Sequence, residues 1–219
     1  LPVLSGGGVN ILSAQMLGPT RLLKGSLPVD RGNAIGGVMD MTLRKGNNTG
    51  REWTAQAGLI GLDLSTEGPI GDGMRASYLL NYRYSALGVL GALGVDLGDE
   101  AIDFQDLSFH VATPLGTGGE LRVFGFGGTS RNRFVSERDT SVWEVDKDGS
   151  DITYTAQTGA VGATLRAPSG TRASITSTVV LSATEQERVE DVLSPNDFTI
   201  ARTQEARVGE RKLSAVVRY

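Results

Sequence analysis

The chain has 219 residues, of which 30 are Gly and none is Cys, and its formal net charge is −4. With no Cys and a single His, disulfide scaffolds, cysteine-ligated zinc or iron–sulfur sites and multi-histidine metal centres are excluded, and the acidic balance argues against nucleic-acid binding. Mean hydropathy is −0.10 and no stretch approaches the ~20 apolar residues of a membrane-spanning helix, although this test does not detect transmembrane strands.

Residues 1–48 form a glycine-rich region with short apolar runs. Short strands are predicted over 6–12, 21–25 and 36–43, with one short helix near 13–16, joined by turns that need positive φ. Four glycines of this region stand out: Gly25, Gly32, Gly36 and Gly37. Their spacing fits neither a Walker A motif nor a dinucleotide fingerprint, so we interpret them as sites of tight turns and close packing, not of phosphate binding.

From residue 51 onward, apolar and polar residues alternate with the period of two that is typical of strands with one apolar face. Eight antiparallel strands are predicted, over 51–58, 60–67, 74–84, 104–113, 120–130, 153–166, 172–184 and 208–219. Leu, Val, Ala and aromatic residues occupy one face, and Ser, Thr, Asn and a few charged residues occupy the other. The small polar side chains are typical of a crowded, wet interior.

The connections between these strands alternate in length. Short connections are expected at 68–73, 114–119 and 167–171, and long connections at 86–103, 131–152 and 185–207. Outer-membrane barrels have tight turns on one rim and long loops on the other. Eight strands alone would close a narrow barrel filled by side chains, which leaves no place for residues 1–48. We therefore predict part of a transmembrane barrel of about 22 strands with a filled lumen.

Three tyrosines lie at the ends of predicted strands on the apolar face, namely Tyr82, Tyr84 and Tyr219. This position favours an aromatic girdle at the membrane interface, and the alternative is that they are ordinary strand tyrosines. Charged strand residues such as Arg83 and Asp106 are expected on the polar face, because a charge on the lipid face at the bilayer midplane costs roughly 2–4 kcal/mol.

Ser108 and His110 share the polar face of one strand and could form a nucleophilic Ser–His pair. No nucleophile elbow accompanies them, so we predict no enzyme activity and expect His110 to bond to the N-terminal region or to water. Asp146, Asp148 and Asp151 resemble a calcium loop but lack the closing Glu of an EF-hand. We expect a solvated turn there, and neither a metal nor another cofactor.

Ligand binding is expected at the long connections. An indole can stack on a ligand, and guanidinium groups can hold an anion. The candidates are Arg83, Arg131, Arg133 and Trp143. The alternative is a mobile surface loop without a ligand.

Residues 23–41, which contain Gly-Gly-Val, resemble the end of the plug domain of TonB-dependent receptors. Residues 51–70 are similar to the first barrel hairpin of that family. The stretches 81–85 and 104–108 resemble the Bacteroidetes-type receptors that carry a carboxypeptidase-regulatory-like N-terminal domain. The chain departs from the family at residues 31–32, where Arg-Gly stands in place of the frequent Tyr-Gly.

The resemblance implies the C-terminal part of a plug at 1–48 and the N-terminal part of a transmembrane barrel at 49–219, in the cell outer membrane. It also implies active uptake of a scarce nutrient (a siderophore, vitamin, peptide or glycan) that is bound by extracellular loops and plug. The expected partners are the TonB energy-coupling complex, engaged through a segment N-terminal to this chain, outer-membrane lipid, and a surface lipoprotein that could cap the barrel.

The chain begins at Leu1 within an apolar run and ends at Tyr219 directly after a predicted strand, so we interpret it as an internal fragment. A different class of function remains open from the residues alone. Alternating strands also occur in a soluble or surface-exposed β-sandwich module that binds carbohydrate or protein.

Overall fold

The computed structural model describes residues 12–25, 36–58, 61–71, 75–85 and 100–219. Within these ranges the chain is all-β, with ten strands, three short 3-10 helices and no α-helix. None of the helices among the described residues is long and apolar enough to span a membrane.

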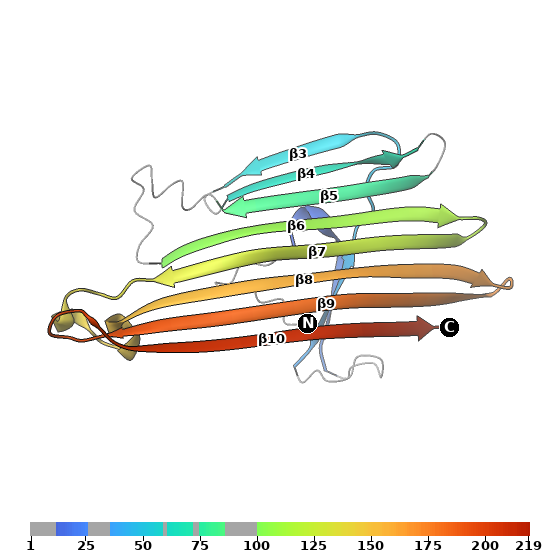
Figure 1. Ribbon diagram of the computed structural model, residues 1–219. Coiled ribbons are helices and arrows are strands. Elements are labelled where there is room, and N and C mark those ends of the chain that lie inside the picture. Colours follow the sequence, from blue (N-terminus) through green and yellow to red (C-terminus); the bar gives the residue numbers. More distant parts are fainter. Residues whose placement is uncertain (1–11, 26–35, 59–60, 72–74, 86–99) are drawn as a thin grey trace.

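Eight strands form one antiparallel sheet in which spatial order follows chain order (Figure 1). The strands are β3 (Glu52–Ala57), β4 (Gly61–Ile70), β5 (Ala76–Ser85), β6 (Glu100–Leu115), β7 (Gly119–Phe134), β8 (Ser150–Ser169), β9 (Ala173–Leu193) and β10 (Ile200–Arg218). All eight predicted strands are present, and the last five are longer than predicted. The sheet is open, with β3 and β10 as its edges in the part of the chain that the structure describes.

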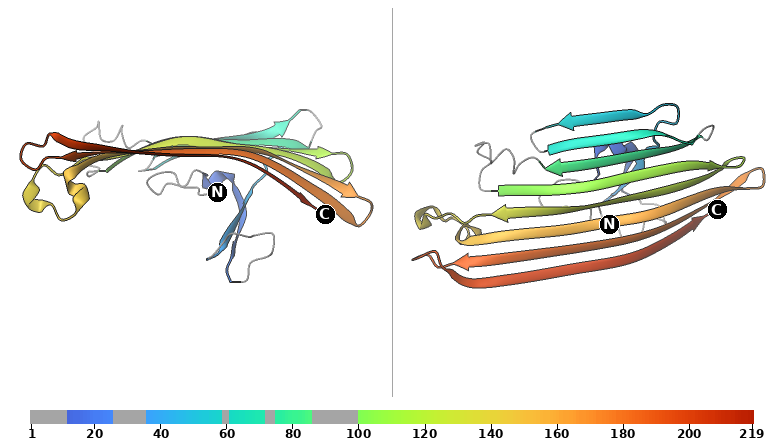
Figure 2. Two further views of the ribbon diagram at one scale, coloured as in Figure 1. Left: turned by 60° about the horizontal axis from the view of Figure 1, so that its bottom comes forward. Right: turned by 45° about the horizontal axis from the view of Figure 1, so that its top comes forward.

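The N-terminal segment, which comprises the described residues 12–25 and 36–48, lies against one face of this sheet (Figure 2, left). Ser13 caps the 3-10 helix η1 (Ala14–Met16) by accepting a 3.1 Å hydrogen bond from the Gln15 amide. β1 (Leu17–Leu23) and β2 (Val38–Leu43) then pair antiparallel. The short helix near 13–16 and the strand predicted over 36–43 are confirmed. The strand predicted over 21–25 is present but begins at Leu17 and ends at Leu23. The strand expected over 6–12 lies almost wholly outside the described residues.

The short connections lie together at one end of the sheet (Figure 1). Glycines in the left-handed region of φ make these turns: Gly71 at 74°, Gly116 at 54°, Gly118 at 84° and Gly170 at 70°. At the opposite end, which we call the loop end, residues 135–149 fold into a compact loop with η3 (Thr140–Val142) and η4 (Asp146–Gly149). The long connection predicted after residue 86 lies largely outside the described residues.

The long connection predicted over 185–207 is wrong. β9 continues to Leu193 and β10 begins at Ile200, so only residues 194–199 connect them. Polar cross-strand pairs replace apolar packing in this extension: Arg207 forms an ion pair with Glu185, and Thr203 donates a 2.5 Å hydrogen bond to Asp191. Because both faces are polar here, the sequence has no period of two that would predict a strand.

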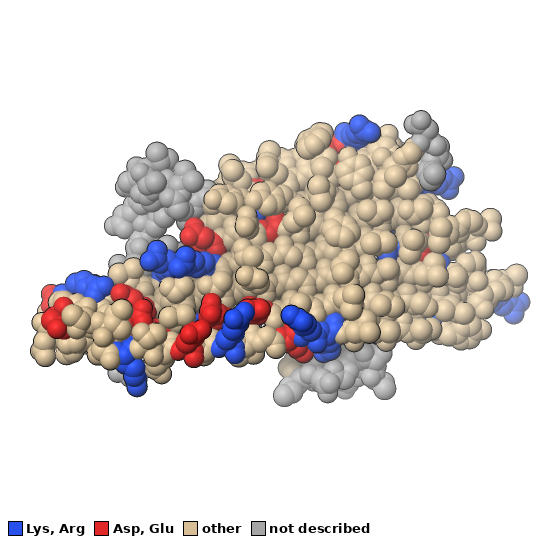
Figure 3. Space-filling model, in the orientation of Figure 1, with Lys and Arg blue, Asp and Glu red and all other residues tan. Residues whose placement is uncertain are grey.

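The two faces of the sheet differ sharply in chemistry. The polar face lies toward the N-terminal segment and buries Ser65, Glu67, Ser77, Asn81, Asp106, Ser108, His110 and Ser130. The opposite, apolar face carries large side chains that are 43% or more exposed: Leu62, Leu64, Leu107, Val161, Leu165, Val179, Leu181, Leu213 and Val217. Figure 3 shows this apolar face, on which charged residues gather toward the loop end of β8, β9 and β10.

Candidate functional site

In the described residues, the N-terminal segment is joined to the polar face by a set of side-chain hydrogen bonds and ion pairs. We take this contact as the candidate functional site. Its apolar centre is small: Met16 is fully buried, and Leu79 of β5 and Ala112 of β6 are 1% and 3% exposed. Hydrogen bonds and ion pairs surround this centre. The segment is therefore held by polar contacts around a few apolar side chains.

Arg44 and Glu67 form the central ion pair of this contact. Both bonds of the guanidinium to the carboxylate are 2.7 Å, and the Asn47 amide donates to the same carboxylate, also at 2.7 Å. The hydrogen bond to Glu67 raises the pKa of Arg44 above its already high ordinary value, so the guanidinium is always charged. The paired, bidentate geometry fixes Arg44 in orientation as well as in distance.

A second polar contact centres on Asp63 of β4. Ser13, which also caps η1, donates its hydroxyl proton to Asp63 at 2.5 Å. Asn81 of β5 donates its side-chain amide to the other carboxylate oxygen. One carboxylate thus links the first turn of the N-terminal segment to two neighbouring strands of the sheet.

His110 also contacts the N-terminal segment, as expected. Its Nδ1 lies 2.6 Å from the Arg44 carbonyl oxygen, so Nδ1–H is the donor. Ser108 is fully buried, and its hydroxyl has no hydrogen-bond partner. His110 is therefore engaged with the backbone of the segment, and no hydrogen bond joins it to Ser108.

The link between the segment and the sheet passes very close to β5. A Cβ atom on Gly46 would lie 2.0 Å from the Tyr78 carbonyl oxygen, a distance that no side chain tolerates. Of the glycines predicted to shape this region, Gly25 has φ of 82°, and a Cβ on Gly37 would lie 2.9 Å from the Leu23 carbonyl oxygen. A Cβ on Gly36 would meet nothing within 4 Å, so close packing does not explain that glycine.

Gly32, the remaining predicted glycine, lies outside the described residues.

Arg83, a predicted ligand residue, is paired within the sheet. It donates to both oxygens of Asp106 at 2.9 and 2.7 Å, and its guanidinium lies 5.7 Å from the centre of the Phe104 ring. Both charged side chains are on the polar face, as predicted, and are nearly buried.

The other predicted ligand residues lie elsewhere. Arg131 and Arg133 alternate with the buried Asn132 and are exposed on the same side of the sheet as the apolar face. Trp143 belongs to the compact loop at the loop end, where its indole N–H donates to the Glu137 carbonyl at 2.9 Å. The four predicted ligand residues therefore do not form one cluster.

The acidic run over 146–151, for which a solvated turn was expected, is organised by hydrogen bonds to its own backbone. Asp148 accepts hydrogen bonds from the amides of Glu144 and Val145 at 2.8 and 3.0 Å, and these bonds hold its pKa below the ordinary value. Within the described part of the chain, no group of three or more His, Asp or Glu side chains is placed to hold a metal ion.

The predicted girdle tyrosines are on the apolar side of the sheet. Tyr82 and Tyr84 are 38% and 45% exposed, and they flank Leu64 and Leu62, their cross-strand partners on β4. Tyr219 directly follows β10 and is 87% exposed.

Sequence reasoning did not single out Arg44, Asp63 or Glu67. A partial signal was present, since Asp63 and Glu67 occupy polar positions of a strand whose alternate positions include Leu62 and Leu64. Two carboxylates on the side that faces another part of the chain need partners. Nothing in the residue pattern identified Arg44 as one of them.

Comparison with protein-family models, with curated proteins and with solved structures finds no match to this chain. The chemistry of the two sheet faces and the contact with the N-terminal segment are therefore the features from which a function can be inferred.

Proposed function

We propose that the chain is part of a TonB-dependent receptor of the outer membrane. In this proposal, residues 1–48 belong to the plug and residues 49–219 to the wall of a larger transmembrane barrel of about 22 strands. The single observation that carries the proposal is the reversed chemistry of the sheet. Its polar side chains are buried under the N-terminal segment, while its large apolar side chains are exposed on the other face.

This arrangement is costly for a protein in water. Burial of apolar surface contributes roughly 25 cal/mol per Å², and soluble proteins rarely expose a contiguous apolar patch larger than a few hundred Å². A lipid environment removes that cost, because the apolar face then contacts hydrocarbon. Transmembrane barrels have this alternation of outward apolar and inward polar side chains.

The apolar stretch also has a suitable length. On the apolar face of β9 it runs from Ile175 to Ala183, interrupted by Ser177, and the charged Glu185 follows. A stretch of about nine residues, tilted by ~45°, rises roughly 20 Å, close to the ~25 Å apolar band of such barrels. Beyond this band, β9 continues as a polar strand toward the loop end.

The contacts of the N-terminal segment suit a domain that must be displaced inside a lumen. Single hydrogen bonds and partly exposed ion pairs each contribute modestly, about 0.5–3 kcal/mol. In the proposed cycle, a nutrient is captured at the loop end, and the TonB complex then draws on the plug to open a path. The chain's residues bind, hold and release, and they form no covalent bond with the nutrient.

The proposal is tested on the full-length protein by cell fractionation. We expect it in the outer-membrane fraction, with a folded form that migrates differently on SDS gels before and after heating. Recovery in the aqueous fraction without heat-modifiable migration would instead support a β-sandwich binding module.

A further inference from the structure

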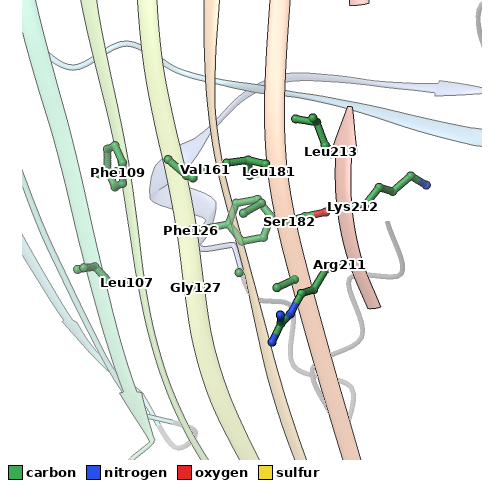
Figure 4. Close-up of a pocket in the computed structure, with 13 residues that line it drawn as sticks. Leu107, Phe109, Phe126, Gly127, Val161, Leu181, Ser182, Arg211, Lys212 and Leu213 are labelled. Carbon is green, nitrogen blue, oxygen red and sulfur yellow. The ribbon is translucent and has the colours of Figure 1, made fainter. Parts of the chain in front are cut away.

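Two of the hollows in the described structure differ in what they can bind. One, of about 770 Å³, is bordered mostly by apolar residues of β6 to β10, among them Leu107, Val161 and Leu181 (Figure 4). In the proposed receptor these three side chains face lipid hydrocarbon. The other hollow lies beside the N-terminal segment and is bordered by charged side chains, which can select a ligand by its charge.

This second hollow, which we call the seam pocket, lies where the N-terminal segment meets the end of the sheet with the short connections. Lys45 and Gly46 border it from the segment, and Arg75, Ser77 and Glu120 border it from the sheet. Its volume of about 330 Å³ is at the lower end of the ~300–1,000 Å³ range of small-ligand sites. The pocket therefore has room for a small solute.

Cations outnumber carboxylates around the seam pocket. Glu120 forms an ion pair with Lys45 and accepts a hydrogen bond from Arg122 at 2.7 Å. Arg166 stands directly opposite Glu120 on β8, and Arg75 borders the pocket just before β5 begins. Neither Arg75 nor Arg166 forms an ion pair with any residue in the part of the chain that the structure describes. One carboxylate therefore has four cations around it.

Two further carboxylates at this end of the sheet do not cancel the excess. Glu67 is bonded through both of its oxygens to Arg44, which brings a positive charge of its own. Glu52, the cross-strand partner of Glu67, accepts a hydrogen bond from the Asn47 side chain. Positive charge therefore remains in excess at the seam pocket.

The cations of the seam pocket are accessible, whereas its carboxylate is largely covered. The side chains of Lys45 and Arg122 are 51% and 35% exposed, and that of Glu120 is 15% exposed. Arg75 is exposed as well. A solute that enters the pocket therefore meets ammonium and guanidinium groups before it meets the carboxylate.

We propose that the seam pocket binds a small oxyanion, carried by a carboxylate- or phosphate-bearing solute, between Lys45 of the N-terminal segment and Arg75 of the sheet. The paired N–H groups of a guanidinium match the oxygens of either group, and the Lys45 ammonium adds a compact positive charge. A cationic solute is repelled here, and a neutral solute forms no charge-assisted hydrogen bond.

The consequence for transport rests on the proposed function. Outer-membrane barrels have their short turns on the periplasmic rim. In the proposed receptor the seam pocket therefore lies at the end where a solute leaves the lumen, beside the segment that must be displaced. A site of this charge favours anionic nutrients over neutral and cationic ones.

The test is calorimetric titration of the full-length protein in an uncharged detergent at low ionic strength. The probes are inorganic phosphate, the tricarboxylate tricarballylate, and tricarballylamide, which is the uncharged analogue of tricarballylate. We expect the two anions to bind and the amide not to bind. The tighter of the two anions identifies the oxyanion that the pocket prefers.

Two variants should change the affinity for the anions in opposite directions. Arg75→Gln removes a cation and should weaken binding by about three- to tenfold, as expected for a partly exposed charged contact at low salt. Glu120→Gln removes the carboxylate that competes for Lys45 and Arg122, and it should strengthen binding by a similar factor.

Arg172→Gln is the matched control. It removes one exposed cation from the same end of the sheet, but Arg172 is not among the residues that border the pocket, so anion binding should be unchanged. Thermal unfolding followed by circular dichroism confirms that each variant is folded.

Absence of anion binding, equal losses in Arg75→Gln and Arg172→Gln, or no gain in Glu120→Gln would overturn the anion site while leaving the receptor proposal in place. Recovery of the full-length protein in the aqueous fraction would overturn the receptor proposal, whereas an anion site defined by these variants would stand.

Discussion

Gly46 lies where the chain passes from the N-terminal segment to the sheet, and it tolerates no side chain. We expect Gly46→Ala to destabilise the protein by about 1–3 kcal/mol, because the new Cβ would overlap the Tyr78 carbonyl oxygen and the backbone must shift. The temperature at which the folded gel band disappears measures the effect.

Gly50→Ala is the control for this change, since a Cβ there meets nothing within 4 Å and should be neutral or slightly stabilising. If the folded gel band disappeared at the same temperature in both variants, the backbone at Gly46 would not lie as close to β5 as the structure shows.

Glu67 is the residue on which the polar hold of the N-terminal segment depends most. Glu67→Gln removes the charge that Arg44 and the Asn47 amide both bind. We expect the free energy of local opening, measured by hydrogen exchange at the Asn47 amide, to fall by about 1.5–3 kcal/mol.

Glu210→Gln is the control, because it removes one negative charge from an exposed position of β10. It should leave hydrogen exchange at the Asn47 amide unchanged. If exchange at Asn47 were the same in both variants, the ion pair would not hold the segment.

These residue-scale contacts were only partly predictable from the sequence. The alternation pattern placed His110 on the polar face, because strand periodicity determines which way a side chain points. The partner expected there was either the N-terminal region or water. The identity of that partner, the Arg44 carbonyl, depends on how two distant parts of the chain pack. No local pattern encodes that distance.

At the scale of elements, the loop over residues 135–149 shows how an acidic run can be structural. Asp148 accepts two backbone amides, and Trp143 packs against Gly149 while bonding to the Glu137 carbonyl. The loop is thus held mainly by contacts within itself.

This loop should be sensitive to acid. Because the hydrogen bonds lower the pKa of Asp148 in the folded loop, its ionised form stabilises the loop at every pH above the ordinary value of about 3.9. That contribution is lost as the pH falls below this value and through the lowered pKa. Hydrogen exchange at the Glu144 and Val145 amides should then accelerate.

In the Asp148→Asn variant, the Glu144 and Val145 amides should exchange faster at neutral pH. The acceleration of their exchange in acid should then disappear. If exchange at these amides accelerated in acid by the same amount in the variant, another group would be responsible. Asp139 would be the first to examine, because hydrogen bonds from Ser141 lower its pKa as well.

β9 and β10 mark the limit of prediction at this scale. Their halves up to residue 184 and from residue 208 were predicted, because one face is apolar there. The halves nearer the loop end pair through Glu185, Arg207, Asp191 and Thr203, and polar residues on both faces remove the periodic signal. In such a segment the two strands pair because the pairing continues from the half of each strand that has an apolar face.

At the scale of the whole molecule, the sheet has the opposite polarity from that of a soluble domain. The order of strands and the presence of two chemically distinct faces were predictable, since both follow from alternation and connection length. The tilt of the N-terminal segment against the polar face and the side-chain contacts that hold it there were not predictable. These depend on packing between elements that are far apart in the chain.

The most direct test of membrane insertion compares spin labels on neighbouring residues of β9 in the full-length protein reconstituted in bilayers. A label at Leu181→Cys should collide often with dissolved oxygen and rarely with a water-soluble nickel chelate, because this side chain faces lipid. A label at Ser182→Cys should show the reverse preference, and a label at Glu187→Cys, above the apolar band, should be open to nickel. Frequent nickel collisions at Leu181→Cys, or no difference between Leu181→Cys and Ser182→Cys, would contradict a sheet that crosses the membrane with its apolar face toward lipid.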